Sequence, residues 1–410
     1  MAQEMDNRKS YWRPVDPMRH HREGGWDYRG RAIYHFTLPV EGRFPLFGTL
    51  AGDRAETAAV RLNAFGQRVR QMASSLAQFY KPRGYALKVL ATMVMPDHVH
   101  LVIQVLEPLP QSIGAVVRGF KSGCTKVYKQ DYYASGENAA AMQGNAAAVQ
   151  GNAAAGQGNA AAVQGNASAV QAAGAWAVPV QFARIFAGRG SIWEPDAAYY
   201  HERILHAPGQ LRRMIDYVKD NPRRLWLKSH HPDLFRLHRR TTVAGLVFTS
   251  MGNHFLLSQP DGQVVEMSRR ATSKQIADRL RTALAAAQQG AVTYTAAVST
   301  GEKLIARTLR EQGFPLVVLL TDGFPKEGHP HERYYKPGGV YFEACSQGRL
   351  LLLEPTEGTF LDATVQQAVE ATLRRKAEER HLYYTPIPTN TQRYRFVALN
   401  EMAKIIVNEP

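Results

Sequence analysis

Two histidines, His98 and His100, lie two residues apart in a stretch that could bind a metal ion. The stretch opens with a turn at Pro96-Asp97 and continues as a mostly apolar run typical of a β-strand. Because side chains alternate faces along a strand, His98 and His100 share one face and Val99 points into the core. Imidazoles held this way can share a divalent metal. The spacing therefore indicates a candidate metal pair.

A second histidine pair of the same spacing, His329-Pro-His331, shows that this spacing is not decisive. It lies among Gly328, Pro325 and Pro330, in a segment with loop character and no strand pattern. An accidental pair with no metal role is therefore the alternative for His98 and His100, and other residues must supply the remaining ligands.

Tyr217 and Asn221 are the candidates that could complete such a site. They are four residues apart in a predicted helix that ends or kinks at Pro222, so they share one helix face. A tyrosine hydroxyl can attack phosphorus, and an amide oxygen can be a third, hard ligand to Mg²⁺ or Mn²⁺. Such a metal would polarise a scissile phosphate. The alternatives are a rim-packing aromatic at Tyr217 and a capping role for Asn221.

The positive charge of the chain is concentrated in its first half. The net charge is +15, and residues 1–240 hold 31 Lys and Arg against 18 Asp and Glu, whereas residues 241–410 hold 19 against 17. This imbalance indicates a polyanionic partner for the first half, with a merely solvated basic surface as the alternative.

Composition also bounds the location of the protein. No run approaches 18 apolar residues, so we expect no membrane span, and the N-terminus shows no secretion signal. Cys124 and Cys345 are far apart and are expected to be free thiols. A cytoplasmic protein is the expectation.

The first half has the pattern of a small α+β domain that spans residues 31–240, after a flexible basic arm at 1–30. The helices are expected on one face of an antiparallel sheet in which the second strand and the histidine strand form a hairpin. The expected elements are strands 32–38 and 87–94 and helices 57–80 and 112–130, then strand 182–186, an edge at 191–194 and helix 208–221, with a loop at 39–53.

A low-complexity segment interrupts this domain. Between residues 139 and 173 a glutamine recurs every seven residues in Ala-Ala-Ala-Val-Gln-Gly-Asn units. The units carry glycine and lack an apolar seam, which argues against a coiled coil. A flexible linker over 135–177 is expected.

Residues 241–410 have the pattern of a separate α/β domain. Apolar strands alternate with helices here, which predicts a buried parallel sheet. The expected strands are 243–249, 254–257, 264–267, 292–298, 315–320 and 350–353, and the helices are 274–287, 302–312, 339–346 and 362–380.

Five motifs of the first domain resemble the REP-associated tyrosine transposases, which are single-tyrosine HUH nucleases. They cover most of residues 31–235 outside the linker. In order they are Tyr34-His-Phe-Thr37, Met95-Pro-Asp-His-Val-His-Leu101, Arg118-Gly-Phe-Lys-Ser122, Ile192-Trp-Glu194 and Tyr217-Val-Lys-Asp-Asn-Pro222. Two departures are the low-complexity insertion and Glu202 in Tyr200-His-Glu202, where aspartate is expected.

The resemblance implies a ferredoxin- or RRM-like HUH sheet and a function. His98, His100 and Asn221 would be ligands of Mg²⁺ or Mn²⁺, and Tyr217 the nucleophile. The tyrosine would become linked to the 5′ phosphate of cut single-stranded DNA and leave a free 3′-OH. The expected protein is a transposase of REP-like hairpin DNA, active in transposition and recombination, as a monomer or homodimer.

Four further residues are predicted to contact DNA. Arg118, Lys121 and Lys126 share one helix and suit backbone phosphates, with a solvated basic face as the alternative. Trp193 could stack on a base, with a core position as its alternative.

The second domain resembles the Rossmann-like DNA-processing-protein-A (SLOG) type. The matching stretches are Val298-Ser-Thr-Gly-Glu-Lys303, Pro315-Leu-Val-Val-Leu-Leu320 and Gly348-Arg-Leu-Leu-Leu-Leu-Glu-Pro355. Ser299, Thr300 and Gly301 could present backbone N–H groups to a phosphate of a nucleotide or single strand, or could form an ordinary β–α turn. Two other functions stay open, a non-cleaving DNA-binding protein or regulator and a nucleotide sensor led by this domain.

Overall fold

The computed structural model describes residues 25–130, 191–194, 201–324 and 339–408. The linker at 135–177, the strand expected at 182–186, the second histidine pair at 329–331 and most of the basic arm lie outside these residues. The described residues form two compact units, 25–226 and 227–408. The division falls before residue 240, because helix α8 (Pro232–Phe235) and strand β7 (His238–Val243) pack within the second unit.

The first unit is built on an antiparallel sheet of four strands in the order β4-β5-β1-β6. Strands β4 (Leu87–Val94) and β5 (His98–Val105) form the expected hairpin, and β1 (Ala32–Pro39) pairs with β5. The edge strand β6 (His201–Ile204) was not among the predicted strands and pairs with β1.

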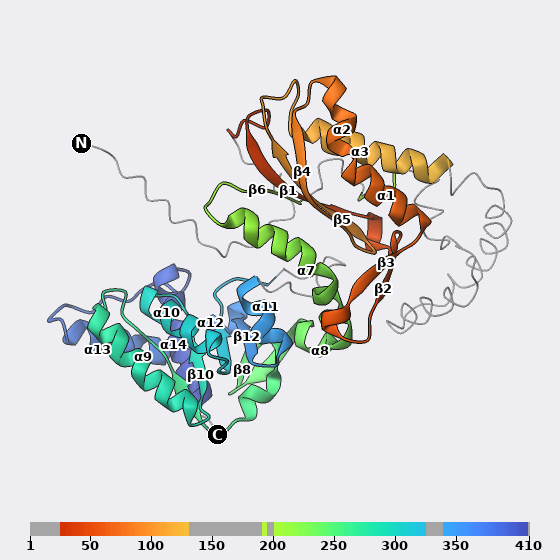
Figure 1. Cartoon of the computed structure of the whole chain (residues 1–410). Helices are drawn as coiled ribbons and strands as arrows, with labels where there is room; N and C mark the ends of the chain where they lie inside the picture. Colours follow the sequence, from red (N-terminus) through yellow and green to blue (C-terminus); the bar gives the residue numbers. More distant parts are fainter. Residues whose placement is uncertain (1–24, 131–190, 195–200, 325–338, 409–410) are drawn as a thin grey trace, which may run out of the picture. The chain divides into compact units, whose positions relative to one another are not determined.

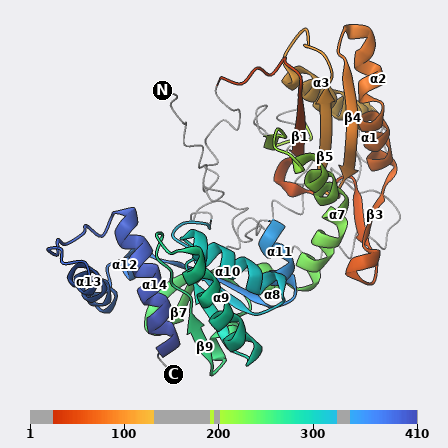
Figure 2. The same cartoon turned by 60° about the vertical axis from the view of Figure 1, so that its left-hand side comes forward.

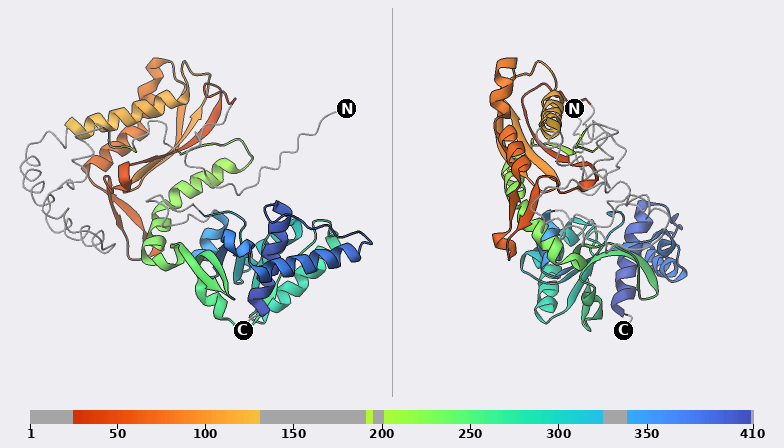
Figure 3. Two further views of the ribbon diagram at one scale, coloured as in Figure 1. Left: turned by 180° about the vertical axis from the view of Figure 1, so that it is seen from behind. Right: turned by 90° about the vertical axis from the view of Figure 1, so that its right-hand side faces the viewer.

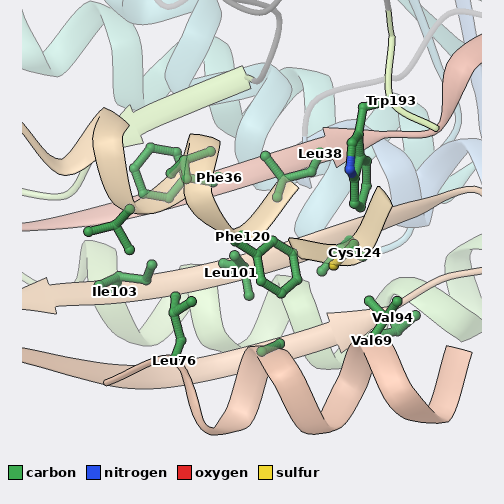
Figure 4. Close-up of a cluster of buried hydrophobic side chains, with 14 of the residues drawn as sticks. Phe36, Leu38, Val69, Leu76, Val94, Leu101, Ile103, Phe120, Cys124 and Trp193 are labelled. Atoms are coloured by element: carbon green, nitrogen blue, oxygen red, sulfur yellow. The ribbon is translucent and has the colours of Figure 1, made fainter. Parts of the chain in front are cut away.

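One face of this sheet holds the main hydrophobic core of the unit. Alternate residues of β1 and β5, such as Phe36 and Leu101, are fully buried there against three helices, as Figure 4 shows. The helices are α1 (Ala64–Ser74), α2 (Leu76–Tyr80) and α3 (Ile113–Tyr128), and Figure 3 shows them from behind.

Helix α7 (Gln210–His230) covers the opposite face, so the expectation that helices lie on one face only was wrong. Its Met214 and Val218 form a second small core with Val102 of β5. The histidine strand is buried on both faces over most of its length, which a near-continuous apolar run indicates. The helix continues through Pro222, so it does not end there, which was one of the two outcomes predicted for this proline.

The helix predicted over residues 57–80 is a strand followed by two helices. Ala59–Leu62 forms β3, which pairs with β2 (Gly48–Ala51). Helix α1 starts after Asn63, whose side chain accepts a hydrogen bond from the Gly66 amide at 2.7 Å. This N-cap ends the strand and fixes the helix start. Short 3₁₀ turns complete the unit at Glu41–Arg43, Ala55–Thr57 and Lys81–Arg83.

The second unit contains a six-stranded mixed sheet in the order β7-β8-β12-β11-β10-β9. Strands β9 to β12 are parallel to one another, and β8 joins β12 in antiparallel register. The remaining strands are β8 (Leu246–Gly252), β9 (Gly262–Val264), β10 (Val292–Thr295), β11 (Leu316–Leu319) and β12 (Leu350–Pro355). The strand predicted at 254–257 is a 3₁₀ helix, His254–Ser258, because Asn253 caps it through Phe255 N.

Helices surround this sheet, as Figure 2 shows. Helix α14 was not predicted; it packs against α13, β9 and β10. The helices are α9 (Ser273–Gln288), α10 (Thr300–Glu311), α11 (Gly339–Ser346), α12 (Glu357–Phe360), α13 (Ala363–Glu378) and α14 (Gln392–Asn408). None of the helices in the described ranges of either unit has the length and apolar character needed to cross a membrane.

Candidate functional site

The candidate site lies on the face of β1 and β5 that α7 covers. In the antiparallel register Thr37 is opposite His100 and Pro39 is opposite His98. Opposite residues project to the same face, so Thr37 and His100 lie together on the side away from the main core. His100 is 2% exposed and His35 is 7% exposed, so both rings are buried.

The two predicted ligand histidines approach each other closely. Their Nε2 atoms are 3.0 Å apart, and the ring planes are nearly perpendicular at 88°. Two nitrogens bound to one metal at about 2.1 Å and at right angles would themselves lie about 3.0 Å apart. The spacing of His98 and His100 therefore fits a shared metal ion.

The other ring nitrogen of each histidine has its own partners. Nδ1 of His98 lies 2.5 Å from Oδ1 of Asp97, and Arg43 lies 3.6 Å from the second oxygen of that carboxylate. Nδ1 of His100 lies 3.0 Å from Nε2 of His35 and 3.1 Å from Oγ1 of Thr37. With a proton on each Nδ1, both Nε2 atoms can act as metal ligands.

Helix α7 brings the predicted nucleophile to the histidines. The Tyr217 ring centre is 5.7 Å from that of His100 and 6.2 Å from that of His35, both in edge-on geometry. The guanidinium of Arg224 lies 5.3 Å from the Tyr217 ring centre. The phenol is half-buried, and its Oη makes no hydrogen bond with any described residue.

Asn221 lies one helical turn beyond Tyr217 and is buried. Its Nδ2 donates to the Tyr217 carbonyl at 2.8 Å, with a longer contact of 3.4 Å to the Val218 carbonyl. Anchoring the nitrogen leaves Oδ1 as the free end of the amide, and Oδ1 has no hydrogen-bond partner among the described residues. The side chain therefore has the free oxygen that a hard metal ion prefers.

Within residues 25–130, 191–194, 201–324 and 339–408, no cluster of three or more His, Cys, Asp or Glu side chains could hold a metal. The predicted donor set differs, because its third member is an amide. Two imidazoles with facing Nε2 atoms and an amide oxygen suit a divalent ion of the Mg²⁺ or Mn²⁺ type.

His35 is the site residue that the sequence analysis missed. It contacts His100 through a 3.0 Å nitrogen pair and stacks on that ring with centres 5.1 Å apart. The signal was present in Tyr34-His-Phe-Thr37, where apolar and polar residues alternate. In a strand this alternation puts His35 and Thr37 on the face away from Tyr34 and Phe36.

The predicted DNA-contact residues of α3 do not share one environment. Arg118 and Lys126 are exposed, whereas Lys121 is only 8% exposed. Burial lowers the pKa of the Lys121 ammonium to about 8, although the nearby Glu194 carboxylate raises it. Lys121 therefore cannot offer its charge to DNA as Arg118 and Lys126 can, and α3 packs on the sheet face opposite the histidine pair.

Trp193 is a core residue, and its predicted role in base stacking was wrong. It is 1% exposed, and its ring centre lies 5.8 Å from that of Phe47 and 6.3 Å from that of Phe120. Figure 4 shows Trp193 among the buried side chains of the main core. Its Nε1 donates to the Lys121 carbonyl at 2.9 Å. A ring buried on all sides presents no face to a base.

The predicted phosphate loop of the second unit is already occupied by a carboxylate. Glu302 is 1% exposed, and its Oε2 accepts from the amides of Val298 and Ser299 at 2.7 and 2.9 Å. Ser299 caps α10 in return by accepting from the Glu302 amide. The Ser299, Thr300 and Gly301 turn is therefore a capping box, in which a phosphate would compete with Glu302. A Cβ at Gly301 would lie 3.1 Å from Ile276, so helix packing accounts for the glycine.

A pocket of about 290 Å³ lies next to this turn, at the carboxyl ends of β9 and β10. Arg269 and Arg380 contribute exposed cations, and Asn400 is buried with no hydrogen-bond partner for its Oδ1 among the described residues. Lys376 also lines the pocket but is paired with Glu266 at 2.8 Å. The pocket therefore offers positive charge and one unsatisfied acceptor to a ligand.

Comparison with known proteins gave a structural likeness alone. No family model matches the chain, and no curated protein matches it. One similar solved structure is a presumed transposase from Deinococcus radiodurans R1, at 13% identity, covering 49% of this chain and 96% of that chain. Its TM-score of 0.22 is too low to carry an argument about fold or function.

Proposed function

We propose that this protein is a metal-dependent endonuclease and strand-transferase of single-stranded DNA, with Tyr217 as its nucleophile. The observation that carries the proposal is the packing of the Tyr217 ring against His100, beside a histidine pair with facing Nε2 atoms 3.0 Å apart. A phenol next to a candidate divalent-metal site suits attack on a phosphodiester.

In the proposed reaction the Tyr217 Oη loses its proton and attacks the phosphorus of the scissile phosphodiester. The bond between phosphorus and the 3′ oxygen breaks, and that oxygen takes up a proton to become a free 3′-OH. The DNA 5′ phosphate stays bonded to Tyr217, and attack by another 3′-OH reverses the step and joins a new strand. A Mg²⁺ or Mn²⁺ ion held by His98, His100 and Asn221 would supply positive charge to the phosphate and the leaving oxygen.

The charge of the first half of the chain supports a DNA substrate. Residues 1–240 hold 31 Lys and Arg against 18 Asp and Glu, and this positive balance favours binding to a polyanion. REP-like hairpins are the substrate class that the resemblance of the five motifs implies, and the single-stranded form gives Tyr217 access to the backbone.

The test incubates the full chain with Mg²⁺ or Mn²⁺ and a labelled single-stranded hairpin oligonucleotide from beside its own gene. We expect a covalent protein–DNA band on a denaturing gel that is lost with chelator and in Tyr217→Phe. Tyr383→Phe is the matched control, because Tyr383 is fully exposed in the second unit. The band should persist in this control.

A different outcome would favour the non-cleaving DNA-binding protein. In that case the wild type retains hairpin DNA on native gels and forms no covalent band with any of several flanking hairpins. A band that survives in Tyr217→Phe would instead keep the nuclease and reject Tyr217 as its nucleophile.

A second candidate function concerns the pocket of the second unit. We propose that it binds a small anionic ligand of the nucleotide class, because Arg269 and Arg380 line the same pocket as Asn400, whose Oδ1 has no hydrogen-bond partner among the described residues. A ribose or base donor could satisfy that oxygen, and the arginines suit phosphate.

Calorimetric titration of the full chain with AMP and with inorganic phosphate tests this candidate. Arg269→Ala and Asn400→Ala should weaken AMP binding, whereas Arg270→Ala, an exposed neighbour outside the pocket, should not. Equal AMP affinity in all four proteins would reject a ligand at this pocket.

A further inference from the structure

Each histidine of the Nε2 pair is held at its far nitrogen by a different part of the first unit. His98 is held from the β4–β5 turn and His100 from strand β1. A metal-binding imidazole is oriented, and its tautomer fixed, by the group bonded to its other nitrogen. These partners therefore decide whether both Nε2 lone pairs are available.

The partner of His98 is a carboxylate that is itself held. Asp97 Oδ1 lies 2.5 Å from Nδ1 of His98, and Arg43 lies 3.6 Å from Asp97 Oδ2. Asp97 also accepts the Val40 amide through its backbone carbonyl at 2.9 Å, so the turn is tied to the end of β1. The carboxylate can accept a hydrogen bond from Nδ1 and so fixes the orientation of the imidazole ring.

The partners of His100 are a histidine and a threonine of strand β1. Nε2 of His35 and Oγ1 of Thr37 lie 3.0 and 3.1 Å from its Nδ1, and both can accept a proton from that atom. The stacking of His35 on His100 fixes the ring plane as well. Either partner alone can hold the Nδ1 proton.

We infer that Asp97, His35 and Thr37 are positioning residues that orient the rings of His98 and His100 so that both Nε2 atoms can bind one metal ion. The inference rests on the proposed function. It assigns unequal roles, because the Asp97 carboxylate holds Nδ1 of His98, whereas His35 and Thr37 both hold Nδ1 of His100 and can substitute for each other.

The test measures Mn²⁺ binding to the full chain by electron paramagnetic resonance, without DNA. Asp97→Ala should weaken Mn²⁺ affinity by about 10- to 100-fold, and Asp97→Asn, which keeps an acceptor oxygen, should recover part of it. His35→Phe and Thr37→Val should each have a small effect, and the double variant should lose about 10- to 100-fold.

Thr92→Val on β4 is the matched control for Thr37→Val. Thr92 is opposite Leu101 on the main-core face, and its buried Oγ1 has no hydrogen-bond partner among the described residues. Its Mn²⁺ affinity should equal that of the wild type. Thermal unfolding of each variant without metal separates a loss of positioning from a loss of folding.

Two outcomes would overturn the inference in distinguishable ways. If the double variant His98→Ala/His100→Ala loses Mn²⁺ while Asp97→Ala and His35→Phe/Thr37→Val bind it as the wild type does, the metal site stands and the positioning role fails. If His98→Ala/His100→Ala binds Mn²⁺ as tightly as the wild type, the proposed metal site fails and the positioning role fails with it.

Discussion

The side-chain amide of Asn221 donates to the backbone carbonyl of Tyr217, with 2.8 Å between Nδ2 and the oxygen. It also approaches the Val218 carbonyl, which Pro222 cannot reach with a backbone N–H. The Asn-Pro dipeptide therefore lets helix α7 continue and at the same time fixes the amide nitrogen against the helix backbone. This local arrangement couples the backbone of the proposed nucleophile to the proposed third ligand.

Pro222→Ala tests this arrangement. Alanine restores an N–H to the Val218 carbonyl, so we expect α7 to become more stable by about 2 kcal/mol. This figure is the gain in helix propensity, reduced because alanine restricts the unfolded chain less than proline does. Hydrogen exchange of α7 amides, measured by mass spectrometry, should slow in the variant. Unchanged or faster exchange would show that proline is not the weak point of the helix.

Arg118→Ala and Lys121→Met form a matched pair on one helix. Arg118 is exposed and should contact phosphate, so its loss should lower DNA affinity. It should also reduce, by about 1, the slope of the logarithm of the binding constant against the logarithm of the salt concentration. Lys121→Met removes a buried charge and should leave both quantities unchanged. Fluorescence-anisotropy titrations at several salt concentrations measure them, and equal effects of the two substitutions would contradict the assignment.

Glu354 should make the stability of the second unit depend on pH. Burial raises the pKa of its carboxyl from 4.5 to about 6, against the lowering effect of the Phe324 amide, and Asp322 adds to the rise. Between these values the folded state keeps a proton that the unfolded state loses, so stability falls as pH rises from 4.5 to about 6. The loss should amount to about 2 kcal/mol.

Glu354→Gln should remove this dependence, because glutamine does not titrate and its oxygen can still accept from Gly323 and Phe324. Urea unfolding at several pH values compares the two proteins. Parallel pH curves for wild type and variant would contradict the role of Glu354.

Glu302→Ala should destabilise the second unit by about 2 to 3 kcal/mol. The substitution leaves the amides of Met267, Val298 and Ser299 without the carboxylate that accepts from them. Lys303→Ala, at an exposed neighbouring position, is the control and should change stability little. Urea unfolding provides the comparison, and equal stability of the two variants would reject the capping role.

The sequence by itself determined the local geometry of the proposed site. Alternation along β5 puts His98 and His100 on one face, and the four-residue spacing puts Tyr217 and Asn221 on one helix face. The structure then places Tyr217 against His100. Such features follow from backbone periodicity, which neighbouring residues fix without help from distant ones.

Only the tertiary structure decided which residues contact the proposed site residues and which predicted residues are buried. His35 contacts His100 because β1 and β5, which are distant in the sequence, pair in the sheet. Helix α7 covers a sheet face for which the sequence pattern predicted no helix. Trp193 and Lys121 are buried because they meet each other across a long separation, and Glu302 fills the turn that was expected to bind phosphate. Burial and hydrogen-bond partners depend on long-range packing, which composition and spacing do not specify.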